Sequence, residues 1–531
     1  MVKAPAFLVF FALLGCTNAF AQTGACSQQS SKLACVLPEE YGSTPAFTQV
    51  LYSFAGHPFH FESDFGTVLQ PFTSDIGRQV NLLPLASPSS GVIYDPSLKT
   101  FVSEDSLGPV LGERAETVGR HRFFIGFSYQ YFNFDKLDGI NLQNFPAILT
   151  HTDDNTNNST STAIVNCSIS PSTGFSLIQN SSLNGCGFVR DRIDTLNSIN
   201  LKVNEYTTYL TFGLTRHVDL SVLIPIETVQ MSISSQATIV PGTNGDIVPV
   251  VGSSDQTQNN QCAAASGSTK LTCTSNGPPY FFHLFKNCPN TSPSTGLSGL
   301  APQCLVHTFP DPSFTGSGSA ANNSATGIGD VVARVKWNAF EGERAGIAVG
   351  LDMRFPTGDA LNYLGSGSYG VKPFAVFSYR WRISPHALVG VGWNSDSVTA
   401  GDLSTGTKGN VPNEFDYTVG ADARVTRWLT GAFDIVGQRF FDAETVSEVP
   451  TAFLNNCGSC TADPNPKTVT LNNLKTNTNA SYNITNASLG IKARPFPGLS
   501  RLVFTANVLI RLDNGGLGSK ASPLVGLGYT F

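Results

Sequence analysis

The sequence predicts an all-β chain that folds as a 12-stranded antiparallel up-and-down transmembrane β-barrel, with long extracellular loops and an irregular N-terminal segment. Three observations favour this fold. Runs of about 10–16 residues alternate apolar and polar side chains, as strands between lipid and a lumen must. The links between these runs alternate in length. Charged residues are only 13% of the 531 residues, and no segment keeps the 3.6-residue period of a long amphipathic helix.

The N-terminus has the parts of a secretory signal peptide, which we expect to span residues 1–21. Lys3 supplies the positive charge, Ala6 to Gly15 the apolar run, and Ala19-Phe20-Ala21 a small-residue cleavage site. A lipoprotein processing box that ends at Cys16, which would leave Cys16 lipidated, is the alternative.

Residues 22–118 show no ladder of alternating runs and are rich in Pro, Ser and Gly. We expect them to form either a periplasmic extension or a plug folded into the barrel. After Gln22 there is no run of about 18 apolar residues, so the sequence predicts no membrane-spanning helix. Residues 119–531 form the predicted barrel.

Twelve runs in this part alternate well enough to be predicted as strands. In the fourth, for example, Val335 and Trp337 share the outward face, and Arg334 and Lys336 share the inward face. In the second, Ile199, Leu201 and Val203 share one face. The predicted strands are residues 120–135, 193–214, 218–233, 328–338, 346–356, 370–381, 386–397, 414–425, 429–441, 480–494, 501–512 and 522–531.

The links between these strands alternate between short and long. Short links lie at residues 215–217, 339–345, 382–385, 426–428 and 495–500. The other links, which alternate with these along the chain, are longer, and the longest are residues 136–192 and 234–327. Short periplasmic turns and long extracellular loops are typical of outer-membrane barrels. A soluble β-sandwich has no reason to sort loop lengths in this way.

The last strand ends the chain on Phe531, and this resembles the terminal signature of bacterial outer-membrane barrels. The resemblance implies outer-membrane lipid as a partner, insertion by the barrel-insertion machinery through this strand, and a location in the cell outer membrane. A formal net charge of −6 argues against a nucleic-acid partner.

Ten cysteines follow the signal peptide, and an even number in an exported chain indicates disulfides. All ten lie outside the predicted strands, and the simplest expectation is local pairing. The candidate pairs are Cys26–Cys35, Cys167–Cys186, Cys262–Cys273, Cys288–Cys304 and Cys457–Cys460. A redox role for the last pair lacks the βαβ context that such chemistry needs.

Several stretches resemble the family of outer-membrane transporters named after the meta-pathway of phenol degradation. They include Gly327 to Trp337, Gly350 to Asp359, Leu364 to Gly367 and Gly370 to Phe374. The resemblance covers mainly residues 201–226 and 327–531. It implies a channel for small, often hydrophobic or aromatic, compounds.

Charged residues on the inward face of the strands are the candidate lumen-lining groups. Neighbouring strands bring opposite signs together, so the charges form either a salt-bridged wall or a selectivity ladder. We favour the salt-bridged wall. The candidates are Asp330, Arg334, Lys336, Asp352, Arg354, Lys372, Arg380, Glu414, Asp416, Asp422, Arg424, Lys492, Arg494 and Arg511.

We therefore predict a channel for passive uptake of small, hydrophobic or aromatic solutes. Inward Phe374, Leu388 and Leu509 are the expected apolar contacts, and Arg354, Lys372 and Arg380 would meet a carboxylate or phenolate group. The alternative from another class is a structural or adhesive barrel that acts through its long loops.

Enzyme function is disfavoured. A hydrolase needs a Ser nucleophile with a His base, and no His lies in such a motif. The Gly-rich stretch Gly365 to Gly370 matches a dinucleotide-binding fingerprint, but a strand and not a helix is expected to follow it. The sequence indicates no cofactor and no metal.

Overall fold

The computed structural model describes part of the chain in each of its predicted regions except the signal peptide. The described residues are 32–35, 51–53, 61–62, 72–76, 92–95, 100–103, 107–151, 192–240, 262–264, 271–273, 283–286, 300–301, 303–309, 324–403, 405–454, 468–494, 496 and 501–531. The predicted signal peptide lies outside them. Among the described residues, no helix is long and apolar enough to cross a membrane.

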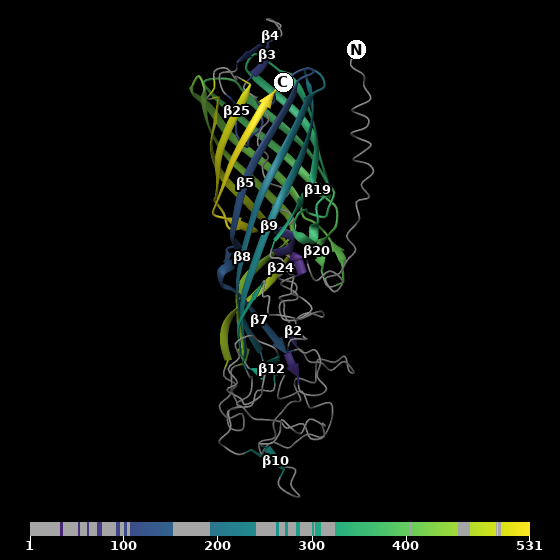
Figure 1. The fold of residues 1–531 in the computed structure, drawn as a ribbon, viewed down its shortest axis with the longest axis vertical. Helices are drawn as coiled ribbons and strands as arrows, with labels where there is room; N and C mark the ends of the chain where they lie inside the picture. The colour runs from purple at the N-terminus through teal and green to yellow at the C-terminus, as the bar shows by residue number, and fades with distance from the viewer. Residues whose placement is uncertain are drawn as a thin grey trace.

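Twelve long strands form one closed antiparallel barrel, so the predicted fold class is confirmed (Figure 1). The strands are β5 (Phe123–Leu137), β8 (Arg192–Gly213), β9 (Val218–Val240), β16 (Val331–Glu341), β17 (Ala345–Phe355), β18 (Gly370–Tyr379), β19 (Ile383–Asn394), β22 (Asn413–Thr426), β23 (Leu429–Leu454), β24 (Thr468–Ala493), β25 (Leu502–Arg511) and β27 (Ala521–Thr530). The barrel closes where β27 pairs with β5, in a register that runs from Leu524 opposite Gln130 to Thr530 opposite Phe124.

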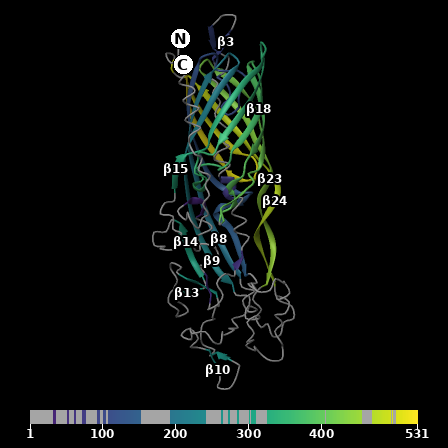
Figure 2. The same ribbon diagram turned by 90° about the vertical axis from the view of Figure 1, so that its right-hand side faces the viewer.

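Short turns join strands at one end of the barrel, which we call the short-turn end, and it lies at the top of Figure 1. At the opposite, long-loop end, the hairpins β8–β9 and β23–β24 extend well beyond the other strands (Figures 1 and 2). β9 continues to Val240, and β23 and β24 meet as far as Leu454 and Thr468. The extent of β8 agrees with the predicted strand 193–214, whereas the extended ends of β9, β23 and β24 were predicted as loops.

The missed extensions have a physical reason: the apolar face of the strands reverses partway along. On β8, Tyr206 points outward and is 50% exposed, whereas Leu201 and Val203 are fully buried inside. Its partner β9 reverses at the same level, with Ile226 outward and Val229 inward. Beyond this level the outward residues, except Leu196, are polar, which suits strands that have left the hydrocarbon for water.

Smaller strands complete the wall at the long-loop end. They lie inside segments predicted as long loops, except β2, which belongs to the N-terminal segment. β14 (Gln303–Phe309) and β15 (Ser324–Ile328) continue the line of β16 along β9. β6 (Ile140–Asn141) and β7 (Phe145–His151) pair with β5 and β8, β2 (Phe61–Glu62) pairs with β7, and β26 (Leu517–Ser519) pairs with β5.

All four tryptophans are exposed on the outside of the barrel, at about half of their surface. Trp337, Trp381 and Trp428 lie beside short turns, and Trp393 lies at the long-loop end of β19. Girdles of aromatic side chains at both rims of an apolar band are typical of barrels that cross a bilayer.

The interior at the long-loop end is a packed apolar core. The loop after β17 folds inward there, with η7 (Ala360–Asn362), Tyr363 and Leu364 all contributing to it. Burial raises the pKa of the Tyr363 hydroxyl. Two pieces of the N-terminal segment also join the core: η2 (Leu33–Cys35), and the helical turn at residues 72–76.

Polar contacts fix these N-terminal pieces. Lys32 pairs with Asp359 at 2.5 Å, and the Tyr482 hydroxyl donates to Asp75 at 2.7 Å. At the other end of the molecule, β3 (Val92–Asp95) and β4 (Thr100–Ser103) form a hairpin beyond the barrel rim (Figure 1). Described parts of residues 22–118 therefore lie at both ends of the barrel.

Residues 107–118, which we call the plug segment, cross the interior near the short-turn end. The Leu107 N–H donates to the Thr430 hydroxyl at 2.9 Å, and the Val118 N–H donates to the Asp219 carboxylate at 3.0 Å. Between these anchors, Val110 and Ala115 are fully buried.

Four of the ten mature cysteines lie among the described residues. Cys35 is fully buried and disulfide-bonded. Cys262 and Cys273 lie directly opposite each other on β10 (Cys262–Ala264) and β11 (Leu271–Cys273). Cys304 lies in β14, opposite Ala237. Cys262, Cys273 and Cys304 thus lie outside the twelve predicted strands, but in short strands inside the segment 234–327 that was predicted as a long loop. The proposed pairings stay predictions. Cys26, Cys167, Cys186, Cys288, Cys457 and Cys460 lie outside the described residues.

The reversal of the apolar face gives a test within one strand. Leu210→Arg places a charge in the outward apolar band of β8 and should destabilise the barrel by about 2–4 kcal/mol in bilayers. Asn200→Arg, outward on the same strand but beyond the reversal, should cost less than about 1 kcal/mol. Urea unfolding from lipid vesicles measures both. Equal losses would contradict the placement of the band.

Candidate functional site

The inward charges predicted on neighbouring strands come together in the lumen. Arg334 of β16 lies opposite Asp352 of β17, and Asp352 lies opposite Lys372 of β18. Residues opposite each other in a sheet share a face, so one row carries alternating charges. The Arg334 guanidinium donates to both oxygens of Asp352, at 2.6 and 2.8 Å.

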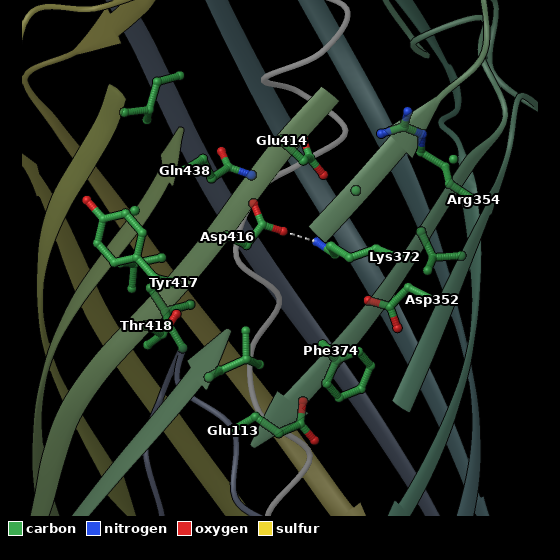
Figure 3. A pocket seen from close by; sticks show the side chains of 18 of the residues that line it. Glu113, Asp352, Arg354, Lys372, Phe374, Glu414, Asp416, Tyr417, Thr418 and Gln438 are labelled. Atoms are coloured by element: carbon green, nitrogen blue, oxygen red, sulfur yellow. Dashed lines mark hydrogen bonds and ion pairs between the residues drawn. The ribbon is translucent and has the colours of Figure 1, made fainter. Parts of the chain in front are cut away.

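Lys372 reaches across a whole strand to its ion-pair partner. Its Nζ lies 2.5 Å from Asp416 of β22, although β19 runs between the two strands (Figure 3). Two glycines of β19 lie close to charged side chains of this wall. A Cβ at Gly390 would lie 3.4 Å from Lys372 Cγ, and one at Gly392 would lie 2.6 Å from Glu414 Cγ. A Cβ at Gly390 would therefore be in ordinary contact with Lys372, whereas a side chain at Gly392 would displace Glu414.

Arg354 is held by neutral and acidic groups together. Its Nη2 donates to the Ser368 hydroxyl at 3.0 Å and to Asn394 Oδ1 at 2.7 Å, and its Nε lies 3.9 Å from Asp330. Asp330 accepts in turn from the Ser366 N–H at 2.8 Å and from its hydroxyl at 2.6 Å. The Gly-rich stretch is thus an inward-folded loop that leads into β18.

The plug segment is fastened to the wall by Glu113. Its two carboxylate oxygens accept from Arg334 Nη1 at 2.5 Å and from Lys336 Nζ at 2.9 Å. Lys336 also donates to the carbonyl oxygens of Arg114, at 3.2 Å, and Glu116, at 2.8 Å. One lysine therefore holds both the side chain and the backbone of the segment.

A second cluster lies on β19, β22 and β23, nearer the short-turn end. Arg114 of the plug segment pairs with Asp422 at 2.7 Å, and His386 Nε2 lies 2.6 Å from Asp434. His386 is buried, and its ring nitrogens face the aspartates 422 and 434 and not a Ser hydroxyl. Gly112 passes so close to the His386 ring that a side chain there would collide with it.

A cavity of about 120 Å³ lies in the lumen beside the plug segment (Figure 3). Phe374 and Leu388 give it an apolar part, and the Arg334 guanidinium lies 4.8 Å from the centre of the Phe374 ring. Neutral polar side chains of Asn394, Tyr417 and Gln438 also line it. The charged groups of its lining are Glu113, Asp352, Glu414, Asp416, Arg334, Arg354 and Lys372.

Other predicted lumen residues lie outside this cavity. Lys336, Asp422 and Lys492 are buried near the plug segment, and Asp330 is buried under the inward loop. Leu509 groups with Val110 of the plug segment in an apolar cluster and does not line this cavity, so its predicted contact with a solute stays a prediction. Leu509 lies on a face that the plug covers.

The remaining predicted cations lie at strand ends. Arg380 donates to the Gly342 carbonyl oxygen at 2.6 Å and lies 3.7 Å from Glu116. Arg511 pairs with Asp513 at 2.6 Å, and Arg494 follows the last residue of β24. Arg424 is exposed at the short-turn end, where the β22–β23 register shifts, so it does not line an enclosed lumen.

Sequence reasoning missed Leu111 and Glu113, because the plug segment has no strand periodicity. A Glu-Arg pair among apolar residues just before the first strand was the only signal.

The family model described as "Putative MetA-pathway of phenol degradation" matches residues 279–448. The predicted resemblance is confirmed over this stretch. The match covers less than half of the chain, but it includes β16–β22 and most of the wall around the cavity. No curated protein matches the chain in sequence.

Among solved structures, the chain is similar to an outer membrane channel from Pseudomonas putida F1, with 10% identity and a TM-score of 0.38, over 78% of this chain and 98% of that one. A FadL homologue from Pseudomonas aeruginosa has 10% identity and a TM-score of 0.27, over 86% of this chain and 97% of that one. The toluene transporter TbuX of Ralstonia pickettii has 10% identity and a TM-score of 0.25, over 85% of this chain and 99% of that one. Similarities this distant support no statement about function.

The Glu113 contacts predict a large loss of stability on truncation. Glu113→Ala leaves Lys336 buried without its carboxylate partner, and such a loss costs about 3–5 kcal/mol. Glu116→Ala removes a carboxylate of the same segment whose nearest cation is 3.7 Å away, and it should cost about 1 kcal/mol or less. Urea unfolding compares the two, and equal losses would show that Glu113 does not fasten the segment.

Proposed function

We propose that the chain is an outer-membrane channel for passive passage of small, uncharged and partly apolar solutes. The observation that carries this proposal is the lumen cavity, which has an apolar part beside charges that are already paired. The outward apolar band with its aromatic girdles supports a membrane location, and the short-turn end would face the periplasm. The description of the matching family agrees with an aromatic solute.

The pairing of the lumen cations argues against an anionic solute. Lys372 is bound by Asp416, Arg334 by Asp352 and Glu113, and Arg354 by Ser368 and Asn394. A carboxylate would have to displace these partners. The cavity lining also has one more carboxylate than it has cations. We therefore abandon the expectation that Arg354, Lys372 and Arg380 meet a carboxylate or phenolate.

Selectivity tests this point. Liposomes that contain the protein should admit a neutral aromatic alcohol several-fold faster than the aromatic carboxylate of the same size. Equal rates for both, and for sugars and amino acids, would indicate a general pore.

The cavity lining offers a matched pair of substitutions on β19. Leu388→Trp adds bulk inside the cavity and should lower solute uptake several-fold without unfolding the barrel. Val389→Trp adds the same bulk to the outward face, where an aromatic residue suits the lipid, and should leave uptake unchanged. If both variants transport as the parent does, solutes do not pass this cavity.

The plug segment is proposed to close the channel at the short-turn end. Glu113→Ala combined with Arg114→Ala removes its ion pairs to β16 and β22 and should raise conductance in planar bilayers several-fold. Adding Ala115→Cys and Gly346→Cys allows a reversible lock. A Cβ at Gly346 would lie 3.0 Å from Ala115 Cβ, so a small outward shift of the released segment brings the pair to the distance of about 3.5–4.5 Å that a disulfide needs. Oxidation should return conductance to the parent level.

The same recordings discriminate the adhesive alternative. A structural or adhesive barrel would conduct neither before nor after the plug segment is released. The long loops of such a protein would bind their target whether or not Glu113 and Arg114 are replaced.

A further inference from the structure

Three polar residues form a row across neighbouring strands on the inside of the barrel. Gln130 of β5 lies opposite Glu205 of β8, and Glu205 lies opposite Glu227 of β9. All three point inward and are buried, at 4%, 5% and 0% exposure. They lie next to Val203 and Val229 of the apolar core, at the level where the outward face changes from apolar to polar.

Most polar atoms of this row have no hydrogen-bond partner among the described residues. The Thr207 hydroxyl donates to Glu205 Oε1 at 2.5 Å. The other Glu205 oxygen, both Glu227 oxygens and the Gln130 amide nitrogen lack a partner. A buried polar atom without a partner costs about 1–3 kcal/mol, and a charged one costs more. Four such atoms in one row point to a ligand.

The charge around the row indicates the sign of that ligand. The charged groups that act on Glu227 are Glu205 and Asp330, and both are acidic. Asp330 is already bound by Ser366 and by the Gly358 N–H. Within the described part of the chain, no lysine or arginine forms an ion pair with Glu205 or Glu227. Two buried carboxylates therefore require a positive ligand.

We infer that Gln130, Glu205 and Glu227 bind a divalent cation of the Ca²⁺ class. Ca²⁺ takes six to eight oxygen ligands in flexible geometry, from carboxylates in one- or two-oxygen contact, amide carbonyls, hydroxyls and water. The Gln130 amide presents its oxygen instead of its nitrogen after a simple flip. Among the described residues, no three Asp, Glu, His or Cys side chains group as a metal site, so neutral oxygens complete this one.

A cation here would link three strands beside a break in the hydrogen-bonded wall. β15 and β16 are separated at Gly329, whose N–H donates to the Pro225 carbonyl oxygen at 2.9 Å. The Glu227 carboxylate lies against Gly329 so closely that a side chain there would collide with it. The ion would thus fix the strands β5, β8 and β9 beside this break.

Calorimetry of the full chain in detergent tests the site. After removal of metal with EDTA at neutral pH, Ca²⁺ should bind at one ion per chain and raise the unfolding temperature. Glu227→Gln should weaken binding more than about tenfold and abolish the shift. This variant should still fold, because it removes a buried charge. Glu448→Gln, an exposed change of the same kind on β23, should behave as the parent does.

Two results would overturn the site. The site is wrong if Ca²⁺ does not bind to the parent, or if it binds equally to the parent and to Glu227→Gln. Stabilisation of the EDTA-treated parent by mild acid, with no bound Ca²⁺ at neutral pH, would mean that Glu205 and Glu227 share a proton instead of a metal ion. The channel proposal is independent of both results.

Discussion

The structure depends on the closure of one sheet. In hydrocarbon every backbone N–H and C=O needs a partner from the protein, and only a sheet without edges supplies this with strands. Here β27 pairs along β5, and the Phe531 N–H completes the seam by donating to the Phe123 carbonyl oxygen at 2.8 Å. Once the sheet is closed, the pleat alone decides which side chains face lipid and which face the interior.

That interior consists of two different environments. At the long-loop end, where water surrounds the wall, the inward faces of β8 and β9 are apolar and pack against the inward loop and the N-terminal pieces. At the level of the outward apolar band, the inward faces are charged. Buried charges are costly unless each is paired. The wall supplies some partners, such as Asp352 for Arg334, and the plug segment supplies Glu113 and Arg114.

The features that depend on a period of two could be predicted from the sequence. Alternation located all twelve strands, and parity placed Arg334, Asp352 and Lys372 on one inner face. It did not predict the ends of β9, β23 and β24, because beyond the band the outward residues are polar and the pattern for lipid disappears. It also did not predict the partners. Lys372 pairs with Asp416 across the intervening strand β19, and Glu113 comes from a segment with no period.

The two closures of the lumen differ in the charges that hold them. Release of the inward loop would expose Leu361, Tyr363 and Leu364, and apolar burial of this kind contributes about 1.5–3 kcal/mol per side chain. Release of the plug segment would break charged contacts and would also expose Val110, Leu111 and Val118, which pack against the wall. The wall keeps partners for some of the charges. Arg334 keeps both bonds to Asp352, and Asp422 keeps His386 beside it. The two closures therefore lose comparable apolar burial and differ in their charges. Without the plug segment Arg334 and Asp422 keep a partner on the wall, whereas Lys336 loses its bonds to Glu113 and to the backbone of the segment.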